Sequence, residues 1–204
     1  MISKEKIIEQ FALTKLQTKK IDQYISEISE HNNNFNIVGK STLLNPWKSH
    51  VLDCIQISNF ISNKKSSILD MGTGAGMPGL ILAISNFNNV SLIDSNLKKI
   101  KFIKLVCLKL NIGVKIYHNR IESLIHKKFD YLISRALANL SKLFFYSHNL
   151  LNKDTVLIFL KGKQAKNEIY EASKRWKFRH EIYQSISDKR GSVVIIRDLN
   201  KING

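Results

Sequence analysis

Hydrophobic residues in the first third of the chain follow helical spacing. Within residues 1–62, apolar side chains recur every three or four positions, for example at Ile21, Tyr24 and Ile28. The polar stretch 31–42 breaks this pattern and predicts a loop between helices. We therefore expect residues 1–62 to form a helical extension that packs on the rest of the protein.

Beyond residue 62, short apolar runs alternate with helical segments. The runs that predict strands are 66–71, 89–94, 114–118, 129–134 and 154–160. The segments that predict helices are 78–86, 96–110, 138–150 and 164–175. Such alternation is typical of a parallel sheet with helices on both faces.

Two further apolar runs follow, around 178–186 and 191–197. No helical segment separates them and the turn DKRGS joins them, so we expect a hairpin whose last strand is antiparallel. The expected fold is α/β and Rossmann-like, with a seven-stranded, mostly parallel sheet in residues 63–204.

A glycine-rich segment, LDMGTGAGMPG, follows the first predicted strand and precedes a helix. Open α/β sheets bind nucleotide-like ligands at this position, and glycines let the backbone turn sharply beside a ligand. Gly72 and Gly74 fit the dinucleotide pattern G-x-G-x-x-G, but Met77 occupies its third position. Asp70, just before the first glycine, would repel a pyrophosphate, whereas it suits S-adenosylmethionine, which is cationic and carries no phosphate. We therefore favour S-adenosylmethionine over NAD as the cofactor.

A second carboxylate, Asp94, ends the second predicted strand, 22 residues past Gly72. This spacing is typical of an acid that hydrogen-bonds the ribose hydroxyls of a cofactor. An isolated aspartate at a strand end is more often a helix cap, but beside the glycine loop we favour the ribose role. The segment GKST at 39–42 lacks the earlier glycine and the preceding strand of a P-loop, so we exclude a nucleotide phosphate site there.

Charge indicates the class of substrate. The chain has 32 Lys and Arg against 16 Asp and Glu, a net charge of +16, and such an excess attracts polyanions. A lysine-rich and asparagine-rich composition, as an AT-rich genome produces, explains part of the lysine count but not the shortage of carboxylates. The basic groups expected near the mouth of the cleft are Lys40, Lys48, Lys161 and Lys163, and Trp47 is a candidate for stacking on a base, although packing is the more common role of such a tryptophan.

Other classes of protein are disfavoured. Two cysteines without a C-x-x-C pair exclude a disulfide framework and a cysteine-rich zinc site, so we expect no metal. No apolar run approaches the roughly 20 residues that span a bilayer, and the charged start is not a signal peptide. We expect a monomeric, cytoplasmic protein with no membrane or protein partner.

Several segments, in the same order and spacing, resemble one known family. They are FNIVGKST, PWKSHVLDC, LDMGTGAGMPG, LIDSNLKKIKFIK, RIE at 120–122, ISRALANL and LKGK. They resemble the guanine-N7 methyltransferase G family of bacterial small-subunit rRNA, also called glucose-inhibited division protein B, over roughly residues 30–165. The resemblance implies a class I methyltransferase fold, S-adenosylmethionine as cofactor, and methylation of N7 of a specific guanine in 16S rRNA. The partner would be that rRNA or the small ribosomal subunit.

The resemblance also implies roles for particular residues. Gly72 and Met77 would contact the cofactor, Ile121 and Glu122 would flank its adenine, and Arg135 would reach the cofactor or the target base. Taken alone, Glu122 is typical of a charge at a helix N-terminus and Arg135 of an ion-pair partner. The complete set expected to bind the cofactor is Gly72, Gly74, Met77, Asp94, Ile121, Glu122 and Arg135. The chain departs from the family pattern at Ala75, where proline is usual, and at Ser49, where arginine is usual.

The chemistry expected needs no acid or base. N7 of guanine carries a free lone pair and no proton, so the enzyme has only to position and desolvate the reactants. Arg135, the single catalytic residue expected, would contact O6 or the cofactor carboxylate, because N7 must stay free to attack. No Pro-Pro-aromatic loop follows the fourth strand, and Cys54 and Cys107 read as inert helix residues. The alternatives are a methyltransferase for a small molecule or a protein, a non-catalytic RNA-binding module, and, more weakly, an NAD oxidoreductase.

Overall fold

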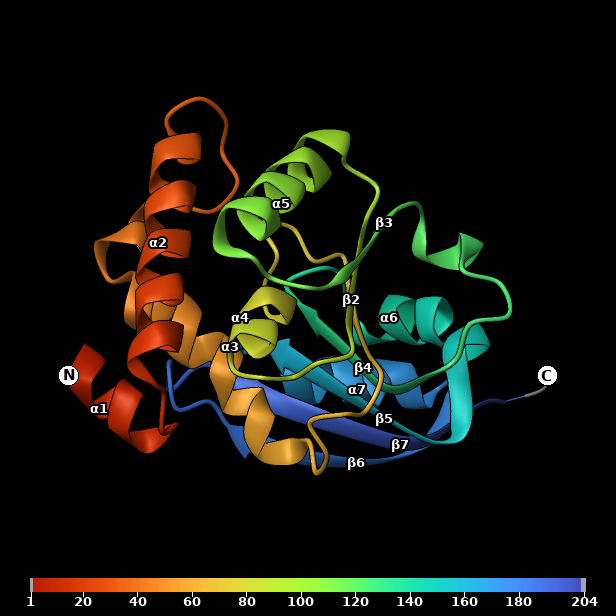
Figure 1. Ribbon diagram of the computed structural model, residues 1–204. Coiled ribbons are helices and arrows are strands. Elements are labelled where there is room, and N and C mark those ends of the chain that lie inside the picture. The colour runs from red at the N-terminus through yellow and green to blue at the C-terminus, as the bar shows by residue number, and fades with distance from the viewer. Residues whose placement is uncertain (1, 203–204) are drawn as a thin grey trace.

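A seven-stranded sheet with the order β3-β2-β1-β4-β5-β7-β6 forms the centre of the computed structural model, which describes residues 2–202 (Figure 1). Strands β1 to β5 are parallel, and β7 pairs antiparallel with both β5 and β6. The strands are β1 (Ile68–Met71), β2 (Val90–Asp94), β3 (Lys115–His118), β4 (Phe129–Arg135), β5 (Leu151–Lys161), β6 (Trp176–Gln184) and β7 (Ser192–Lys201). The prediction of a Rossmann-like sheet with an antiparallel last strand is confirmed.

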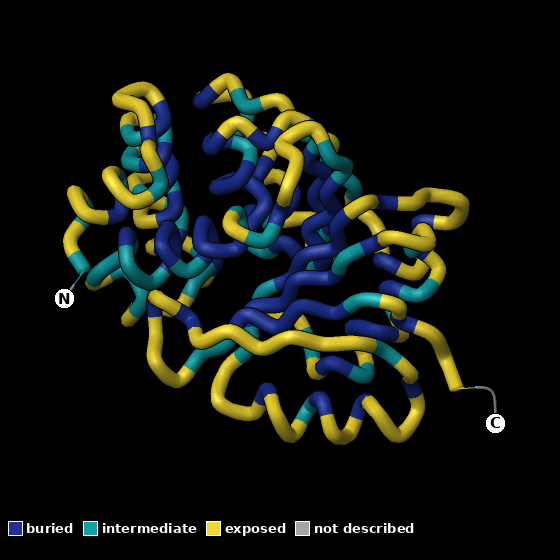
Figure 2. Tube along the Cα trace, turned by 90° about the horizontal axis from the view of Figure 1, so that it is seen from below, coloured by how far each residue is buried: buried dark blue, intermediate teal, exposed yellow. Residues whose placement is uncertain are grey.

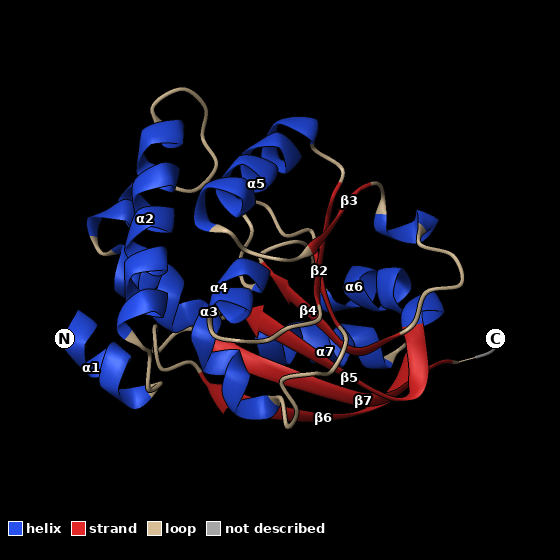
Figure 3. Cartoon of the chain, viewed as in Figure 1, coloured by secondary structure: helices blue, strands red, loops and turns tan. Residues whose placement is uncertain are grey.

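Helices cover both faces of this sheet (Figures 1 and 3). The α-helices are α1 (Lys4–Gln10), α2 (Lys15–Asn32), α3 (Asp53–Ile55), α4 (Gly79–Ile84), α5 (Leu97–Leu110), α6 (Leu140–Ser147) and α7 (Ala165–Ser173). The shorter helical segments are η1 (Lys40–Leu44), η2 (Trp47–Leu52), η3 (Gln56–Phe60), η4 (Ile121–Ser123) and η5 (His148–Leu150). Helices α2, α4 and α5 share one hydrophobic cluster with the sheet, and α6 and α7 share another. Among residues 2–202, no helix is both long and apolar enough to cross a membrane.

Side chains along each buried strand alternate between the two clusters. In β4, Ile133 packs in the cluster of α2 and α4, whereas its neighbour Leu132 packs in that of α6 and α7. The same alternation in β1 sends Ile68 to one face and Leu69 to the other. Figure 2 shows the buried strands at the centre of the molecule, while β6 is largely exposed at the edge of the sheet. The alternation therefore directs Arg135, two residues after Ile133, toward the face that the N-terminal helices cover.

The segment after Pro46 differs from the regular helix that its sequence suggests. Residues 47–52 form one turn of π-helix, η2, which continues into α3 and then the 3₁₀-helix η3. Irregular helical turns of this kind often occur at functional sites, because the widened turn changes the direction of its side chains.

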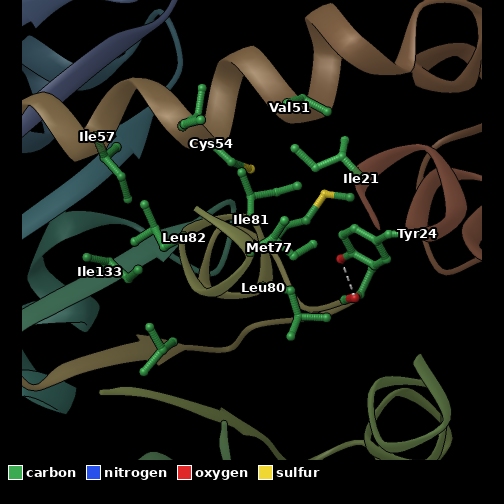
Figure 4. Packing of buried hydrophobic residues seen from close by; sticks show 14 of the residues in the cluster. Ile21, Tyr24, Val51, Cys54, Ile57, Met77, Leu80, Ile81, Leu82 and Ile133 are labelled. Atoms are coloured by element: carbon green, nitrogen blue, oxygen red, sulfur yellow. Dashed lines mark hydrogen bonds between the residues drawn. The ribbon is translucent and has the colours of Figure 1, made fainter. Parts of the chain in front are cut away.

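Helix α2 packs directly against the glycine loop (Figure 4). Its predicted core positions Ile21, Tyr24 and Ile28 are fully buried. The hydroxyl of Tyr24 donates a hydrogen bond of 2.7 Å to the carbonyl oxygen of Ala75, within the loop. The N-terminal helices are therefore tied both to the sheet and to the segment expected to bind the cofactor.

Replacing Tyr24 with phenylalanine should destabilise the protein. Y24F leaves the buried carbonyl of Ala75 without its donor, and such a loss costs about 1–3 kcal/mol in the free energy of unfolding. Urea denaturation followed by circular dichroism measures this change. Y170F, at an exposed tyrosine of α7, is the control and should change stability by less than about 0.5 kcal/mol. Equal stabilities of Y24F and Y170F would contradict the structural role of this hydrogen bond.

Candidate functional site

A cavity of about 750 Å³ opens beside the carboxyl ends of β1, β4 and β5. Open α/β sheets bind their ligands at this edge, and small-molecule sites have volumes of about 300–1,000 Å³. Three segments at the carboxyl ends of strands line the cavity: the loop after β1, the end of β4 and residues 160–163 at the end of β5. The other walls come from segments far apart in the sequence, namely 37–42, 49–53 and the turn 185–192 between β6 and β7.

The glycine loop has the strained backbone that its composition predicts. Gly72 and Gly74 have φ values of 64° and 61°, in the left-handed region that other residues rarely adopt. A Cβ atom on Gly72 would lie 2.4 Å from Cδ1 of Leu137, in the loop after β4. A side chain at Gly72 would therefore be strained by the positive φ, and the end of the Leu137 side chain would have to move.

Asp70 is hydrogen-bonded to both ends of the glycine loop. Its Oδ2 atom accepts hydrogen bonds from the Thr73 hydroxyl at 2.5 Å and from the Gly79 amide at 2.8 Å. The side chain is fully buried, and Oδ1 has no hydrogen-bond partner among the described residues. Burial raises the pKa of Asp70 to about 7, although the hydrogen bonds from Thr73 and Gly79 lower it. Asp70 does not line the cavity, so it contributes to the site by fixing the shape of the loop.

Asp94 joins the end of β2 to the same loop. Its Oδ2 atom accepts a hydrogen bond of 2.9 Å from the Gly74 amide, and its Oδ1 atom accepts one of 2.8 Å from the Asn96 amide. The carboxylate is partly exposed beside the loop. Each of its oxygens can accept a further hydrogen bond, so these contacts do not exhaust its capacity to bind a ligand.

Arg135 is the cation at the centre of the cavity wall. Its Nη1 atom lies 3.2 Å from Oδ2 of Asp53 and 3.3 Å from the carbonyl oxygen of Ser49. Its Nη2 atom lies 3.3 Å from Nδ1 of His50 and 3.0 Å from Sδ of Met77. The side chain is 18% exposed, so β4, η2 and the glycine loop together enclose the guanidinium.

Asp53 extends this network to the turn between β6 and β7. Its Oδ1 atom accepts a hydrogen bond of 2.6 Å from the hydroxyl of Ser187. Gln56 adds two more bonds to the turn, to the Ser185 hydroxyl and from the Ile186 amide. These bonds hold the turn as a fixed wall of the cavity. In each of them, the two bonded residues are more than 120 positions apart in the sequence.

The cavity brings together four of the seven residues expected to bind the cofactor, namely Gly72, Gly74, Met77 and Arg135. Asp94 adjoins it through Gly74. Ile121 and Glu122 lie in η4, outside the cavity lining: Ile121 is buried in the cluster of α6 and α7, and Glu122 is exposed. His118, the last residue of β3, pairs with Asp94 at the end of β2. Because η4 begins three residues later, it follows β3 at the same edge of the sheet as Asp94.

Two residues expected to contact RNA have structural roles instead. Lys161 lines the cavity, but its Nζ atom lies 2.7 Å from both the Ala138 carbonyl oxygen and Glu168, with only 8% of the side chain exposed. Trp47 has the packing role that is more common for such a tryptophan and not the stacking role, because it is buried and its Nε1 atom donates to Asp22. The ammonium of Lys161 and the indole N–H of Trp47 are both hydrogen-bonded, because a buried cation and a buried indole N–H need partners.

Other predictions about side chains have mixed outcomes. Lys163 lines the cavity and is exposed, whereas Lys40 and Lys48 lie outside its lining. Burial raises the pKa of the Cys54 thiol to about 12 and that of Cys107 to about 11, so neither supplies a thiolate near neutral pH. The prediction that both cysteines are inert is therefore supported.

His50, Asp53, Thr42 and the turn 185–192 line the cavity, although no role for them was predicted from the sequence. The spacing of His50 and Asp53, three residues apart on a predicted helix, was a usable signal that both face one side. No local pattern indicated the turn, because its contacts are made across the whole fold.

Solved structures with similar folds include a ribosomal protein methylase and a protein bound to S-adenosylmethionine. The ribosomal protein L11 methylase from Lactobacillus delbrueckii subsp. bulgaricus has a TM-score of 0.58 at 18% identity, covering 71% of this chain and 75% of that protein. A variant of MtNAS in complex with S-adenosylmethionine has a TM-score of 0.60 at 15% identity, covering 95% of this chain and 77% of that protein. With the strand order and the glycine loop, these similarities define the fold as that of a class I, S-adenosylmethionine-dependent methyltransferase.

Sequence comparison narrows this class to one family. Residues 17–196 match the family model for GidB, rRNA small subunit methyltransferase G. The chain is 36% identical over 184 residues to the ribosomal RNA small subunit methyltransferase G of Rickettsia prowazekii, covering 90% of this chain and 95% of that protein. It is 38% identical over 178 residues to the protein of that name from Orientia tsutsugamushi, covering 87% and 89%. The chain belongs to the rRNA small subunit methyltransferase G family, as the resemblance of its motifs predicted.

Alanine at Gly72 should damage the cofactor loop. G72A forces a Cβ atom against Leu137 at a positive φ, which should cost about 1–3 kcal/mol of stability and weaken binding of S-adenosylhomocysteine. G113A is the matched control, because a Cβ atom there meets nothing within 4 Å. Calorimetry and thermal unfolding test both variants, and wild-type affinity in G72A would refute the assignment of this loop.

The titration of Asp70 should make stability depend on pH. Because its folded-state pKa of about 7 lies above the ordinary value of 3.8, the folded protein holds this proton more tightly than the unfolded chain. The contribution to the free energy of unfolding is complete below about pH 4 and is lost as the pH rises through about 7. D70N should remove this part of the dependence, whereas D154N, at an exposed aspartate, should keep it. Urea unfolding at a series of pH values compares them, and parallel curves for D70N and the wild type would contradict the assignment.

Proposed function

We propose that this chain transfers a methyl group from S-adenosylmethionine to N7 of a guanine in 16S rRNA. The observation that carries the proposal is the position of Arg135, which lines the cavity at the end of β4 and contacts Met77 of the glycine loop. A fixed cation beside the glycine loop supports a role for Arg135 in positioning the reacting groups. Membership of the rRNA small subunit methyltransferase G family supplies the substrate class.

The residues around the glycine loop fit a cationic cofactor without phosphate. The carboxylates of Asp70 and Asp94 both lie against the loop, and the buried Oδ1 atom of Asp70 has no hydrogen-bond partner within residues 2–202. A pyrophosphate beside two carboxylates would be repelled, whereas an ammonium or sulfonium would be stabilised. When bound, S-adenosylmethionine supplies an electrophilic methyl group.

Each expected site residue has a role in this proposal. Gly72, Gly74 and Met77 hold the methionyl part of the cofactor. Asp94 accepts hydrogen bonds from its ribose, and η4, with Ile121 and Glu122, flanks its adenine. The support for the adenine role is the order of the strands, because η4 follows β3, which pairs with β2 at Asp94.

Arg135 has one contact that a ligand can replace. Of the acceptors around its guanidinium, the thioether of Met77 is the weakest, and the others are a carboxylate, a carbonyl and an imidazole nitrogen. A carboxylate of the cofactor or O6 of guanine would compete only with this sulfur. Arg135 then positions its partner, and N7 of the base stays free to attack.

The groups that line the cavity do not include a free general base, and guanine N7 does not need one. Among the described residues of the lining, Asp53 is paired with Arg135 and Asp188 with Arg190. Both ring nitrogens of His50 are hydrogen-bonded. The reaction at N7 removes no proton before attack, so the site contributes orientation and exclusion of water.

Positive charge around the cavity supports an RNA substrate. Lys99 and Lys163 line it from two separate segments. With a net charge of +16, these groups would attract the phosphate backbone and bring the base to the cavity. The proposal includes a monomeric, cytoplasmic enzyme whose partner is 16S rRNA or the small ribosomal subunit, with no protein or membrane partner.

Substitution of Arg135 tests the proposal. R135A should lower kcat for methylation of 16S rRNA by about 100-fold, because a positioned charged donor is lost from the reacting complex. R175A removes an exposed arginine from the end of α7 and should retain wild-type activity. Mass spectrometry of the digested rRNA measures the methylated guanine and locates the methyl group.

Mass spectrometry of the rRNA, together with binding assays for S-adenosylhomocysteine and RNA, distinguishes the alternatives. Full methylation by R135A would contradict the role of Arg135, and a methyl group on an exocyclic amine would contradict the N7 assignment. If the wild-type protein binds S-adenosylhomocysteine but methylates no rRNA, a small-molecule or protein substrate replaces the proposal. If it binds RNA but not S-adenosylhomocysteine, the chain is a non-catalytic RNA-binding module.

A further inference from the structure

A chain of hydrogen bonds runs from Arg135 to the opposite wall of the cavity through one histidine. The Nη2 atom of Arg135 lies 3.3 Å from Nδ1 of His50, and Nε2 of the same ring lies 2.8 Å from Oγ1 of Thr42. The Thr42 hydroxyl then lies 2.6 Å from the carbonyl oxygen of Gly39. All four residues line the cavity, so His50 connects the wall 39–42 with the guanidinium.

The donors and acceptors in this chain allow one arrangement of protons. A guanidinium can only donate, so Nδ1 of His50 must accept, and the ring proton is on Nε2. The Nε2–H group then donates to Oγ1 of Thr42, whose hydroxyl hydrogen is used by the carbonyl of Gly39. Every donor in the chain therefore has an acceptor, and reversing the tautomer of His50 would break the contact with Arg135.

We infer that His50 is a positioning residue for Arg135, acting as a neutral imidazole that holds one N–H of Nη2 so that the other faces the replaceable sulfur of Met77. This inference rests on the role of Arg135 in the proposed function. Asp53 contacts only the Nη1 atom of Arg135. The contact of Nη2 with Nδ1 of His50 adds a second point of attachment and so fixes the rotation of the guanidinium. The link to Thr42 in turn fixes the ring.

The surroundings of His50 keep it neutral. His50 is 3% exposed, and both burial and the charge of Arg135 lower its pKa to about 4. The charged groups near it are Arg135 itself and Asp53, which already pairs with that arginine. A second cation at this position would face the guanidinium directly, so the neutral ring is the form that fits.

His50 is a positioning residue and not a catalytic base. Neither ring nitrogen is free to take a proton from a substrate, because Arg135 occupies Nδ1 and Thr42 occupies Nε2. Its effect on the reaction passes through the guanidinium, which predicts that substitutions preserving the Nδ1 acceptor are better tolerated than those preserving the Nε2 donor.

Two amide substitutions separate the two ends of the ring. In H50N, the amide oxygen can occupy the place of Nδ1 and accept from Arg135, while the bond to Thr42 is lost. In H50Q, the amide nitrogen can occupy the place of Nε2 and donate to Thr42, while the acceptor for Arg135 is lost. We expect kcat on 16S rRNA to fall about 10-fold in H50Q and less than about 3-fold in H50N, with KM for the rRNA unchanged in both.

Thermal unfolding and an independent spectroscopic measurement accompany the kinetics. If His50 only supported the fold, the kcat of each variant would correlate with its melting temperature. It would not depend on which of the two hydrogen bonds the variant preserves. Nitrogen NMR of histidine-labelled protein, with His50 assigned by its absence from H50N, should show a neutral ring protonated on Nε2 between about pH 6 and pH 8. This readout needs neither cofactor nor rRNA.

Two results would overturn the inference: equal kcat values for H50N and H50Q, or a His50 ring protonated on Nδ1. Failure of the proposed function would look different, because the wild-type protein would then leave 16S rRNA unmethylated. The tautomer measurement would still decide whether His50 holds Arg135 as we infer.

Discussion

A partly buried guanidinium that must find acceptors on several sides is the constraint around which this site is built. Arg135 ends a central strand, and alternation along β4 sends its side chain toward the N-terminal helices and away from α6 and α7. A cation removed from water is tolerated only when it is paired and hydrogen-bonded. Asp53, Ser49, His50 and Met77 satisfy this requirement from two other parts of the chain. One charge therefore holds the sheet, η2 and the cofactor loop in a common geometry.

The N-terminal helices are part of the site as well as of the core. Helix α2 reaches the glycine loop through Tyr24, and η2 and α3 supply His50 and Asp53 to the cavity wall. The sheet alone would provide the loop after β1 and the cation after β4, as in any Rossmann-like fold. The additional helices provide the acceptors that orient this cation, so what distinguishes this chain from a generic methyltransferase fold lies outside the sheet.

The sequence predicted those features that depend on local pattern. Alternating apolar runs predicted the mostly parallel sheet, and Gly72 and Gly74 predicted the sharp turn after β1, because glycine favours a positive φ. Features that depend on distant partners were missed. Lys161 was expected among the basic groups at the mouth of the cleft, and it lines the cavity, but Glu168 and Ala138 occupy its ammonium. The π-helical turn of η2 was read as a regular helix, since no local signal marks the widened turn. The contacts of Ser187 with Asp53 join positions that no short pattern relates.

Those contacts have a consequence for biosynthesis. Asp53 and Ser187 are separated by 134 positions, so the cavity wall that they hold forms only after the β6–β7 hairpin has been added to the growing polypeptide. A nascent chain can build β1 and its glycine loop early, but it lacks this wall until synthesis is almost complete. Long-range closure of this kind slows folding, because distant segments must meet before their contact contributes stability. Maturation of the pocket is thus coupled to translation of the last strand, and a chain released before that point lacks one wall of its cavity.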